Sequence, residues 1–259
     1  MRRLVIRPGA IGDVIVSLPA LEHLQCDYLE VWTSRPMVPL FHFAQSVRAI
    51  ADTGLDLLGI TEPPRELLDR LQSFDSIISW YGANRPEFRE ATAGLPFTFL
   101  PALPAGDCPV HATDFYLDQV GASPGGVPAL SIDAARENYA VIHPFSGSPR
   151  KNWPLEKFRA LAAKLRMPVR WCAGEEDPAL PEAVRIPNLL ELAQFLAAAA
   201  LYIGNDSGIT HLAAAVGTPT LAIFVASDPK VWAPRGPHVR IADLRSLAQL
   251  PQNLAQYAE

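Results

Sequence analysis

Cysteine is scarce in this chain, and both long apolar runs and an excess of positive charge are missing. The three cysteines, Cys26, Cys108 and Cys172, are far apart and form no C-x-x-C pair. This pattern argues against a disulfide framework or a zinc site and favours a reducing cytoplasm. No apolar run approaches the roughly 20 residues of a membrane-spanning helix. The run at the N-terminus is also too short for the core of a signal peptide.

The charge balance narrows the class of partner. The net charge is −5 at pH 7, so the chain as a whole gives no electrostatic reason to bind nucleic acid. It has no long basic amphipathic helix, and we therefore expect at most peripheral contact with a membrane. What is abundant is apolar residues, at 49%, and proline, at 25 residues. The length of 259 residues suits one large domain or two small ones.

Apolar strand candidates alternate with helical patterns along the chain. The predicted strands are 4–7, 29–33, 47–51, 76–79, 139–143, 169–173, 201–204, 220–224 and 239–241. Helical patterns include 63–72, 112–120 and 155–165. This alternation predicts an α/β fold with parallel sheets. We place a domain boundary at the end of the proline- and glycine-rich stretch 100–133, which gives domains of residues 1–133 and 134–259.

The first polar motif, residues 7–14, directly follows the first predicted strand. Gly9 and Gly12 permit a tight turn with a close backbone approach, and Asp13 follows near the start of a helix. Asp13 is either a general base at the mouth of the sheet or a helix cap. Pro19 removes a backbone donor one turn further on and predicts a kink or a late helix start.

The second motif, residues 143–154, also lies between a strand and a helix. Ser146, Gly147 and Ser148 can offer hydroxyl and amide donors to a phosphate. Lys151 and its neighbour Arg150 can supply positive charge. The alternative is a polar loop with two solvated cations.

Two further motifs follow predicted strands. In residues 172–177, Glu175 or Glu176 can accept hydrogen bonds from ribose hydroxyls, or the acids form a surface turn. In residues 204–219, a strand-to-helix turn brings a carboxylate, a hydroxyl, a bare backbone and an imidazole to one helix N-terminus, where anions and sugar hydroxyls bind well. These groups belong to Asp206, Ser207, Gly208 and His211. The alternative is a capped helix with a buried histidine.

In these motifs the chain resembles glycosyltransferase family 9, the ADP-heptose:lipopolysaccharide heptosyltransferases. The resemblance is dense over residues 1–24 and 139–233. It implies the GT-B fold, in which two Rossmann-like domains with parallel sheets face a central cleft. In that family the N-terminal domain holds the acceptor and the C-terminal domain holds the nucleotide-sugar donor.

The resemblance also implies roles for individual residues. Asp13 would be the catalytic base, and Lys151 would contact the diphosphate. The donor-binding residues would be Ser146, Gly147, Ser148, Lys151, Glu175, Glu176, Asp206, Ser207, Gly208 and His211, with either Glu175 or Glu176 at the nucleoside. The family inverts the anomeric centre and uses neither a metal nor another cofactor, and this chain contains no D-x-D motif that would hold a metal-bound diphosphate.

The expected function is therefore transfer of heptose from ADP-heptose to a glycan or glycolipid hydroxyl. Such an enzyme would act in lipopolysaccharide core synthesis, in the cytoplasm or at the inner membrane. Residues 52–110 contain few arginines and no lysine, which leaves a smaller glycan or a protein side chain open as the acceptor. An inactive nucleotide-sugar-binding module is a further alternative. A dehydrogenase or epimerase is disfavoured by the incomplete glycine fingerprint.

Overall fold

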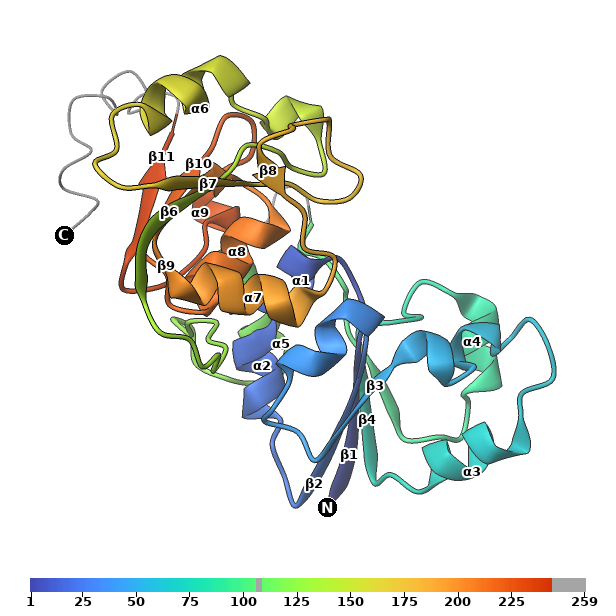
Figure 1. Cartoon of the computed structure of the whole chain (residues 1–259). Helices are drawn as coiled ribbons and strands as arrows, with labels where there is room; N and C mark the ends of the chain where they lie inside the picture. Colours follow the sequence, from blue (N-terminus) through green and yellow to red (C-terminus); the bar gives the residue numbers. More distant parts are fainter. Residues whose placement is uncertain (106–108, 244–259) are drawn as a thin grey trace.

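The chain folds into two β-sheets, one from each half of the sequence (Figure 1). The structure is a computed structural model and describes residues 1–105 and 109–243, so Cys108 lies outside it. The first sheet contains β1 (Arg2–Arg7), β2 (Tyr28–Thr33), β3 (Ser46–Ala49), β4 (Ser76–Ser79) and β5 (Phe97–Phe99). The second contains β6 (Glu137–His143), β7 (Val169–Cys172), β8 (Ala183–Val184), β9 (Ala199–Asn205), β10 (Thr220–Ile223) and β11 (Val239–Ala242).

All recorded strand pairs are parallel, which confirms the predicted α/β class. The strand order is β3-β2-β1-β4-β5 in the first sheet and β8-β7-β6-β9-β10-β11 in the second. Both orders follow the doubly wound plan, in which the chain starts in the middle, moves to one edge and returns to the other. The order reverses beside β1 and beside β6, and ligands of such sheets bind just beyond the carboxyl ends of the strands at these points.

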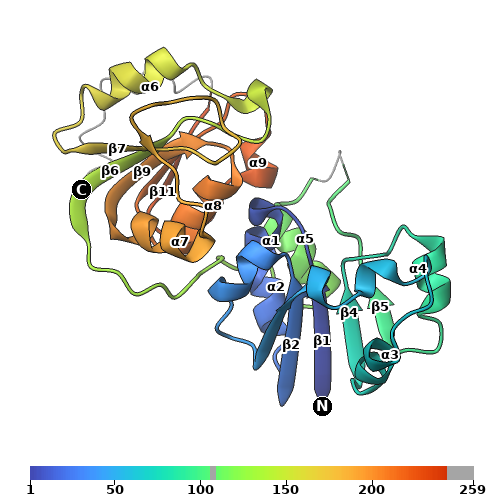
Figure 2. The same ribbon diagram turned by 45° about the vertical axis from the view of Figure 1, so that its right-hand side comes forward.

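Helices connect the strands and cover the sheets (Figure 2). The α-helices are α1 (Ile11–Val16), α2 (Leu18–His23), α3 (Arg65–Gln72), α4 (Pro86–Ala91), α5 (Ala112–Gln119), α6 (Leu155–Ala162), α7 (Leu189–Ala198), α8 (Gly208–Ala215) and α9 (Pro229–Trp232). Short 3-10 helices are η1 (Arg35–Leu40), η2 (Ile50–Asp52), η3 (Leu55–Leu57) and η4 (Pro149–Lys151). The predicted disturbance at Pro19 is a break at Ser17, which ends α1 and precedes α2.

Each sheet separates two apolar layers because alternate residues of a strand point to opposite faces. In β1, Leu4 and Ile6 belong to a cluster with residues of α3 and α4, whereas Val5 belongs to a cluster with α1 and α2. In β6, Val141 belongs to the same cluster as Val5, and Ile142 packs in a cluster with α6. The cluster that contains Val5 and Val141 is therefore one central core shared by both sheets.

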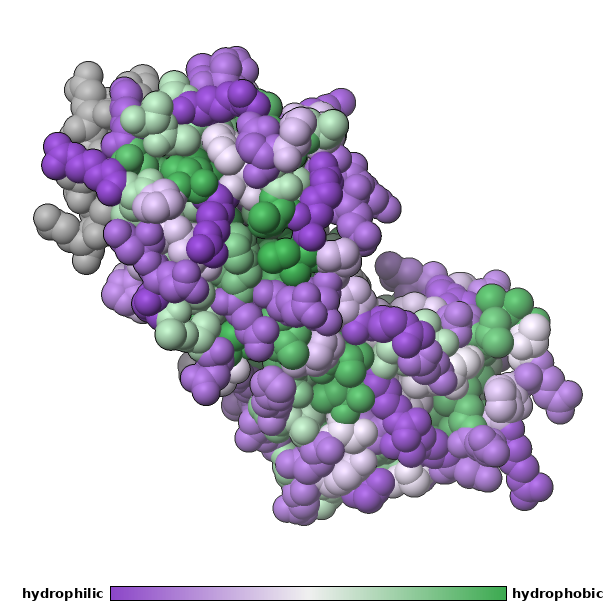
Figure 3. All heavy atoms as spheres, viewed as in Figure 1, coloured by the Kyte–Doolittle hydropathy of each residue, from purple (hydrophilic) through white to green (hydrophobic). Residues whose placement is uncertain are grey.

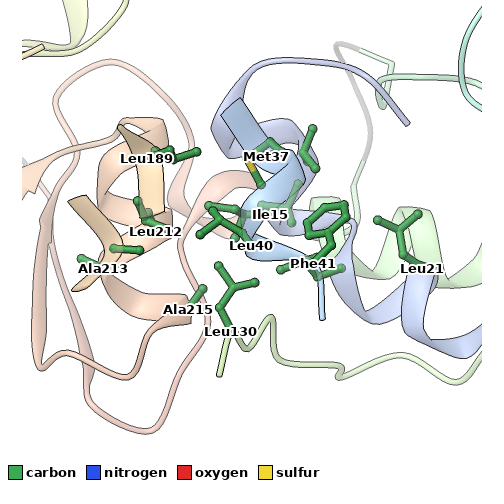
Figure 4. Packing of buried hydrophobic residues seen from close by; sticks show 14 of the residues in the cluster. Ile15, Leu21, Met37, Leu40, Phe41, Leu130, Leu189, Leu212, Ala213 and Ala215 are labelled. Carbon is green, nitrogen blue, oxygen red and sulfur yellow. The ribbon is translucent and has the colours of Figure 1, made fainter. Parts of the chain in front are cut away.

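This central core joins the two halves of the molecule. Ile15 of α1 and Leu40 of η1 lie opposite Leu212 of α8, as Figure 4 shows. The helices α1 and α8 come close because each has a glycine at the contact, Gly12 in α1 and Gly208 in α8. A Cβ atom on Gly208 would lie only 2.9 Å from the backbone nitrogen of Gly12.

Residues 120–136 contain no helix or strand and link α5 to β6. The domain boundary at residue 133 falls in this link and stays a prediction. On the face seen in Figure 3, hydrophilic residues spread over both lobes, and apolar residues form separate groups. Within the described ranges, no helix has the length and apolar character needed to cross a membrane.

Candidate active site between the two sheets

A cavity of about 580 Å³ lies where the carboxyl ends of the two sheets meet. This volume is in the range of pockets that bind small organic ligands. One wall comes from the loop after β1 and from α1, and the other from the segments after β6, β7 and β9. The lining includes Ala10, Ile11, Gly12, Asp13, His143, Ser146, Gly147, Ser148, Lys151, Gly174, Asp177, Asp206, Ser207, Gly208, Ile209, His211 and Trp232. Both points of strand-order reversal thus face the same cavity.

The structure brings most of the predicted site residues together at this cavity. Asp13, the three residues 146–148, Lys151, residues 206–208 and His211 all line it. Arg150, the second cation of its motif, is exposed and outside the lining.

Asp13 is half-buried in the first turn of α1. The N-cap position of this helix is Ala10, so Asp13 is not the capping residue that one interpretation of the sequence suggested. A carboxylate in a first turn interacts favourably with the helix dipole. The Asp13 side chain therefore lines the cavity and has no capping role.

The loop after β6 is held in place by a buried asparagine that the sequence analysis did not single out. The side-chain oxygen of Asn205 accepts a hydrogen bond from the Trp153 amide at 2.9 Å, and its nitrogen donates to the Pro144 carbonyl at 2.7 Å. Asn205 is fully buried, so these contacts satisfy polar groups that water does not reach. They fix both ends of the loop that carries Ser146 and Lys151.

Asp206 is paired with a cation across the cavity wall. The Lys151 ammonium donates to the Asp206 carboxylate at 2.7 Å, and Ser227 donates to the same oxygen. Asp206 is 5% exposed, and a carboxylate buried to this extent needs such partners. Ser227 was also missed in the sequence, because it lies 21 residues from Asp206 in a loop after β10.

His211 lies on α8, directly behind Asp206. Its Nε2 atom is 4.0 Å from the Asp206 carboxylate. Burial lowers the pKa of His211 to about 4, although the neighbouring Asp206 carboxylate acts in the opposite direction. The imidazole is therefore neutral near pH 7 and contributes a polar, uncharged wall to the cavity.

The acidic turn after β7 presents a different acid from the two that were predicted. Glu175 and Glu176 are exposed and outside the lining, whereas Asp177 lines the cavity. Asp177 accepts from the Gly174 amide at 2.6 Å and lies 3.3 Å from Nε2 of His143, a contact that lowers its pKa. A nucleoside contact by Glu175 or Glu176 stays a prediction.

No group of three or more His, Cys, Asp or Glu residues in the described part of the chain is arranged to hold a metal ion. The side chains at the cavity instead offer one base opposite a lysine, several hydroxyls and the N-terminus of α8. Such a set can bind a polyanion on one wall and take a proton on the other.

Comparison with known proteins assigns the family. A sequence model described as glycosyltransferase family 9 (heptosyltransferase) matches residues 118–256, more than half of the chain. The chain belongs to glycosyltransferase family 9. The matched range contains the whole second sheet, and Asp13 lies outside it.

Relatives of the family 9 chain include lipopolysaccharide heptosyltransferase 3 of Escherichia coli. It is 28% identical over 152 residues, which cover 49% of this chain and 43% of the relative. The chain thus spans less than half the length of the curated relatives it matches.

Two solved structures share the fold. E. coli ADP-heptose LPS heptosyltransferase II has a TM-score of 0.73 at 18% identity, with 99% of this chain and 97% of that chain covered. E. coli heptosyltransferase WaaC with ADP has a TM-score of 0.71 at 17% identity, with 99% and 98% covered. The predicted two-domain GT-B architecture is therefore confirmed.

Proposed function

We propose that this chain transfers a sugar from a nucleoside diphosphate sugar to an acceptor hydroxyl, with inversion and without a metal ion. The observation that carries this proposal is that Asp13 and the Lys151–Asp206 pair line one cavity from opposite sheets. A base and a phosphate-binding cation on facing walls are what direct displacement at an anomeric carbon requires. Membership of family 9 supports the same reaction class.

In the proposed reaction, the Asp13 carboxylate takes the proton of the acceptor hydroxyl. The acceptor oxygen then forms a bond to the anomeric carbon, while the bond from that carbon to the diphosphate oxygen breaks on the opposite face. The nucleoside diphosphate leaves with the electron pair. Lys151 and the N-terminus of α8 stabilise the charge that develops on it. General-base assistance of this kind typically contributes about 10²–10⁴ in rate.

Donor binding requires Lys151 to change partner. Its ammonium donates to the Asp206 carboxylate in the structure. A bound diphosphate competes for that ammonium and leaves the Asp206 carboxylate available to sugar hydroxyls. Ser148 supplies a hydroxyl donor to the diphosphate, whereas the Ser146 hydroxyl donates within the loop, to the Ser148 carbonyl or to the Asn152 side-chain oxygen, each at 2.8 Å. Asp177, which also lines the cavity, supplies an acceptor to the nucleoside.

We take ADP as the nucleotide and heptose as the sugar. The fold is shared with a heptosyltransferase solved with ADP, and the sequence relatives are lipopolysaccharide heptosyltransferases. These likenesses support the donor by analogy, and an acceptor in the lipopolysaccharide core follows from the same analogy.

The acceptor has a candidate site next to the base. A second cavity of about 470 Å³ is lined by residues of the N-terminal half, among them Asn84, Arg89 of α4, and Phe97 and Phe99 of β5. Leu103 lines both this cavity and the one that contains Asp13. A glycan with one hydroxyl at Asp13 can extend past Leu103 into the second cavity. Arg89 is the one cation among the described residues that line it, so this cavity suits a part of the acceptor that carries few phosphates.

Ligand binding and turnover test the proposal in sequence. A thermal-shift panel of ADP, UDP, GDP, CDP and NAD should show the largest shift with ADP. Release of ADP from ADP-heptose in the presence of a lipopolysaccharide core acceptor should then follow. A shift with NAD alone would contradict the proposed donor, and ADP binding without any turnover would indicate a binding module.

A further inference from the structure

Arg7, at the end of β1, is a buried cation, 2% exposed. Within the described part of the chain, the acceptors of its side-chain hydrogen bonds are all uncharged. Its guanidinium donates to the carbonyls of Pro8 at 3.1 Å and Asp13 at 2.7 Å, and to the hydroxyls of Ser17 at 3.2 Å and Tyr116 at 2.9 Å. Removing a charge from water is costly unless it is well hydrogen-bonded, so these contacts hold Arg7 firmly.

The contacts of Arg7 span the whole of α1. The Asp13 carbonyl is among the last four of this helix, which lack partners in an ordinary helix end. The Ser17 amide donates to the Val14 carbonyl and not to the Asp13 carbonyl. The Arg7 guanidinium donates to the Asp13 carbonyl in its place. The Ser17 hydroxyl, which accepts from Arg7, also donates to Val14. A cation at a helix C-terminus is favoured by the helix dipole as well.

Tyr116 extends this network to the neighbouring cavity. Its hydroxyl accepts from Arg7 and donates to the Ala102 carbonyl at 2.8 Å. Tyr116 is fully buried, and the Arg7 guanidinium lies 4.8 Å from the centre of its ring. Ala102 lines the second cavity, beside Leu103, which lines both. A continuous chain of hydrogen bonds thus joins the backbone of Asp13 to the wall between the two cavities.

We propose that Arg7 and Tyr116 are positioning residues. They hold the Asp13 carboxylate at a fixed position relative to the cavity wall formed by Ala102 and Leu103. Neither residue contacts substrate. Arg7 fixes the backbone from which the Asp13 side chain extends, and Tyr116 fixes the wall along which an acceptor would lie. We call the chain of hydrogen bonds from Asp13 through Arg7 and Tyr116 to Ala102 the tether. Its existence rests on the contacts alone, whereas its role in catalysis rests on the proposed function.

The sharpest variant is Tyr116→Phe, which removes one hydroxyl and keeps the ring. Tyr139→Phe is a matched control, because Tyr139 is also buried and its hydroxyl also donates to a backbone carbonyl, that of Phe195. Arg7→Lys is the second variant, since it keeps the positive charge and removes the planar guanidinium with its several N–H donors.

Hydrogen exchange of the backbone amides in residues 9–17 measures the tether without any substrate. Exchange should be about 2- to 12-fold faster in Tyr116→Phe than in wild type, as expected for the loss of one hydrogen bond. It should be unchanged in Tyr139→Phe. Equal exchange in wild type and Tyr116→Phe would overturn the proposal.

Turnover measures the consequence for catalysis. Transfer by Tyr116→Phe and Arg7→Lys should fall by up to about 10²-fold in kcat, with the KM for the donor unchanged, since small misplacements of a reacting group have effects of this size. A parallel loss in Tyr139→Phe, or a change in donor KM alone, would contradict positioning. If wild type itself shows no transfer, the proposed function fails, and the exchange result still decides whether the tether exists.

Discussion

The Lys151 ammonium and the Asp206 carboxylate lie 2.7 Å apart, although 55 residues separate them in the chain. The lysine comes from the loop after β6 and the aspartate from the turn after β9, two strands that are neighbours in the second sheet. The pair therefore forms where the strand order reverses, and a ligand that binds there meets both charges.

Loss of the Lys151 side chain should weaken ADP binding. A hydrogen bond to a charged group contributes about 1.5–3 kcal/mol, so Lys151→Ala should raise the Kd for ADP by about 10- to 150-fold in calorimetry. Arg150→Ala is the matched control, because Arg150 is the adjacent cation but is exposed and outside the cavity lining. Equal losses in both variants would point to long-range attraction instead of a direct contact.

The buried imidazole of His211 should make stability depend on pH. Its pKa is about 4 in the folded chain, below the ordinary value of 6.5. The unfolded chain therefore binds more protons between these values, and the contribution to stability is complete above pH 6.5 and is lost as the pH falls towards 4. The Tm should fall over this window, and His211→Gln should flatten the fall. The exposed His238 gives a control, His238→Gln, that should leave the slope unchanged.

An ion pair ties α5 to the segment after α9. The Arg235 guanidinium donates to both oxygens of Asp114, at 2.7 and 2.5 Å, and lowers the pKa of that carboxyl to about 2. Asp114→Asn should reduce the free energy of unfolding at pH 7 by about 1.5–3 kcal/mol.

The effect of this pair should disappear in acid. A lowered folded pKa gives stability that is present above 3.8, the ordinary value, and is lost as the pH falls towards 2. Denaturation of wild type and Asp114→Asn at several pH values should show the two curves converging over this window. Asp118→Asn, at an exposed position of the same helix, should track wild type throughout.

The glycine contact between α1 and α8 should not tolerate a methyl group. In Gly208→Ala the new Cβ would lie 2.9 Å from the Gly12 nitrogen and 3.0 Å from the Ile11 Cβ, so the helices must separate. Overpacking of this kind typically costs about 1–3 kcal/mol. Gly147→Ala is the stability control, because a Cβ there has no neighbour within 4 Å among the described residues. Equal Tm values for the two variants would show that α1 and α8 can separate at little cost in stability.

Much of the fold was predictable because buried parallel strands are apolar runs. The nine predicted strands all occur, whereas β5 (Phe97–Phe99) and β8 (Ala183–Val184) were missed. Both are edge strands of at most three residues, too short for an apolar run to stand out. Their positions depend on neighbouring strands, and no local pattern specifies them.

The sequence was enough to predict several of the residues that line the site. It was not enough to predict which of them contact one another. Placing Asp13, Lys151 and Asp206 after strands was enough to put them at one edge. Sequence spacing could not reveal that Lys151 binds Asp206. It also could not reveal that Arg7 meets Tyr116, because that contact joins positions 109 residues apart.

The acidic turn shows the same limit at short range. Its three consecutive acids differ in exposure because the Gly174 amide and His143 hold only Asp177 inward. Glu175 and Glu176 have the same side-chain chemistry but are exposed. Motif matching alone could not distinguish among neighbours whose orientation is set by a tertiary contact.

The most direct test of the account is a comparison of wild type and Asp13→Asn with ADP-heptose and a lipopolysaccharide core acceptor. The substitution keeps the shape of the side chain and removes its ability to take a proton. The rate of ADP release should fall by about 10²–10⁴, while the Kd for ADP measured by calorimetry stays unchanged. Turnover of Asp13→Asn close to that of wild type would contradict the assignment of Asp13 as the base.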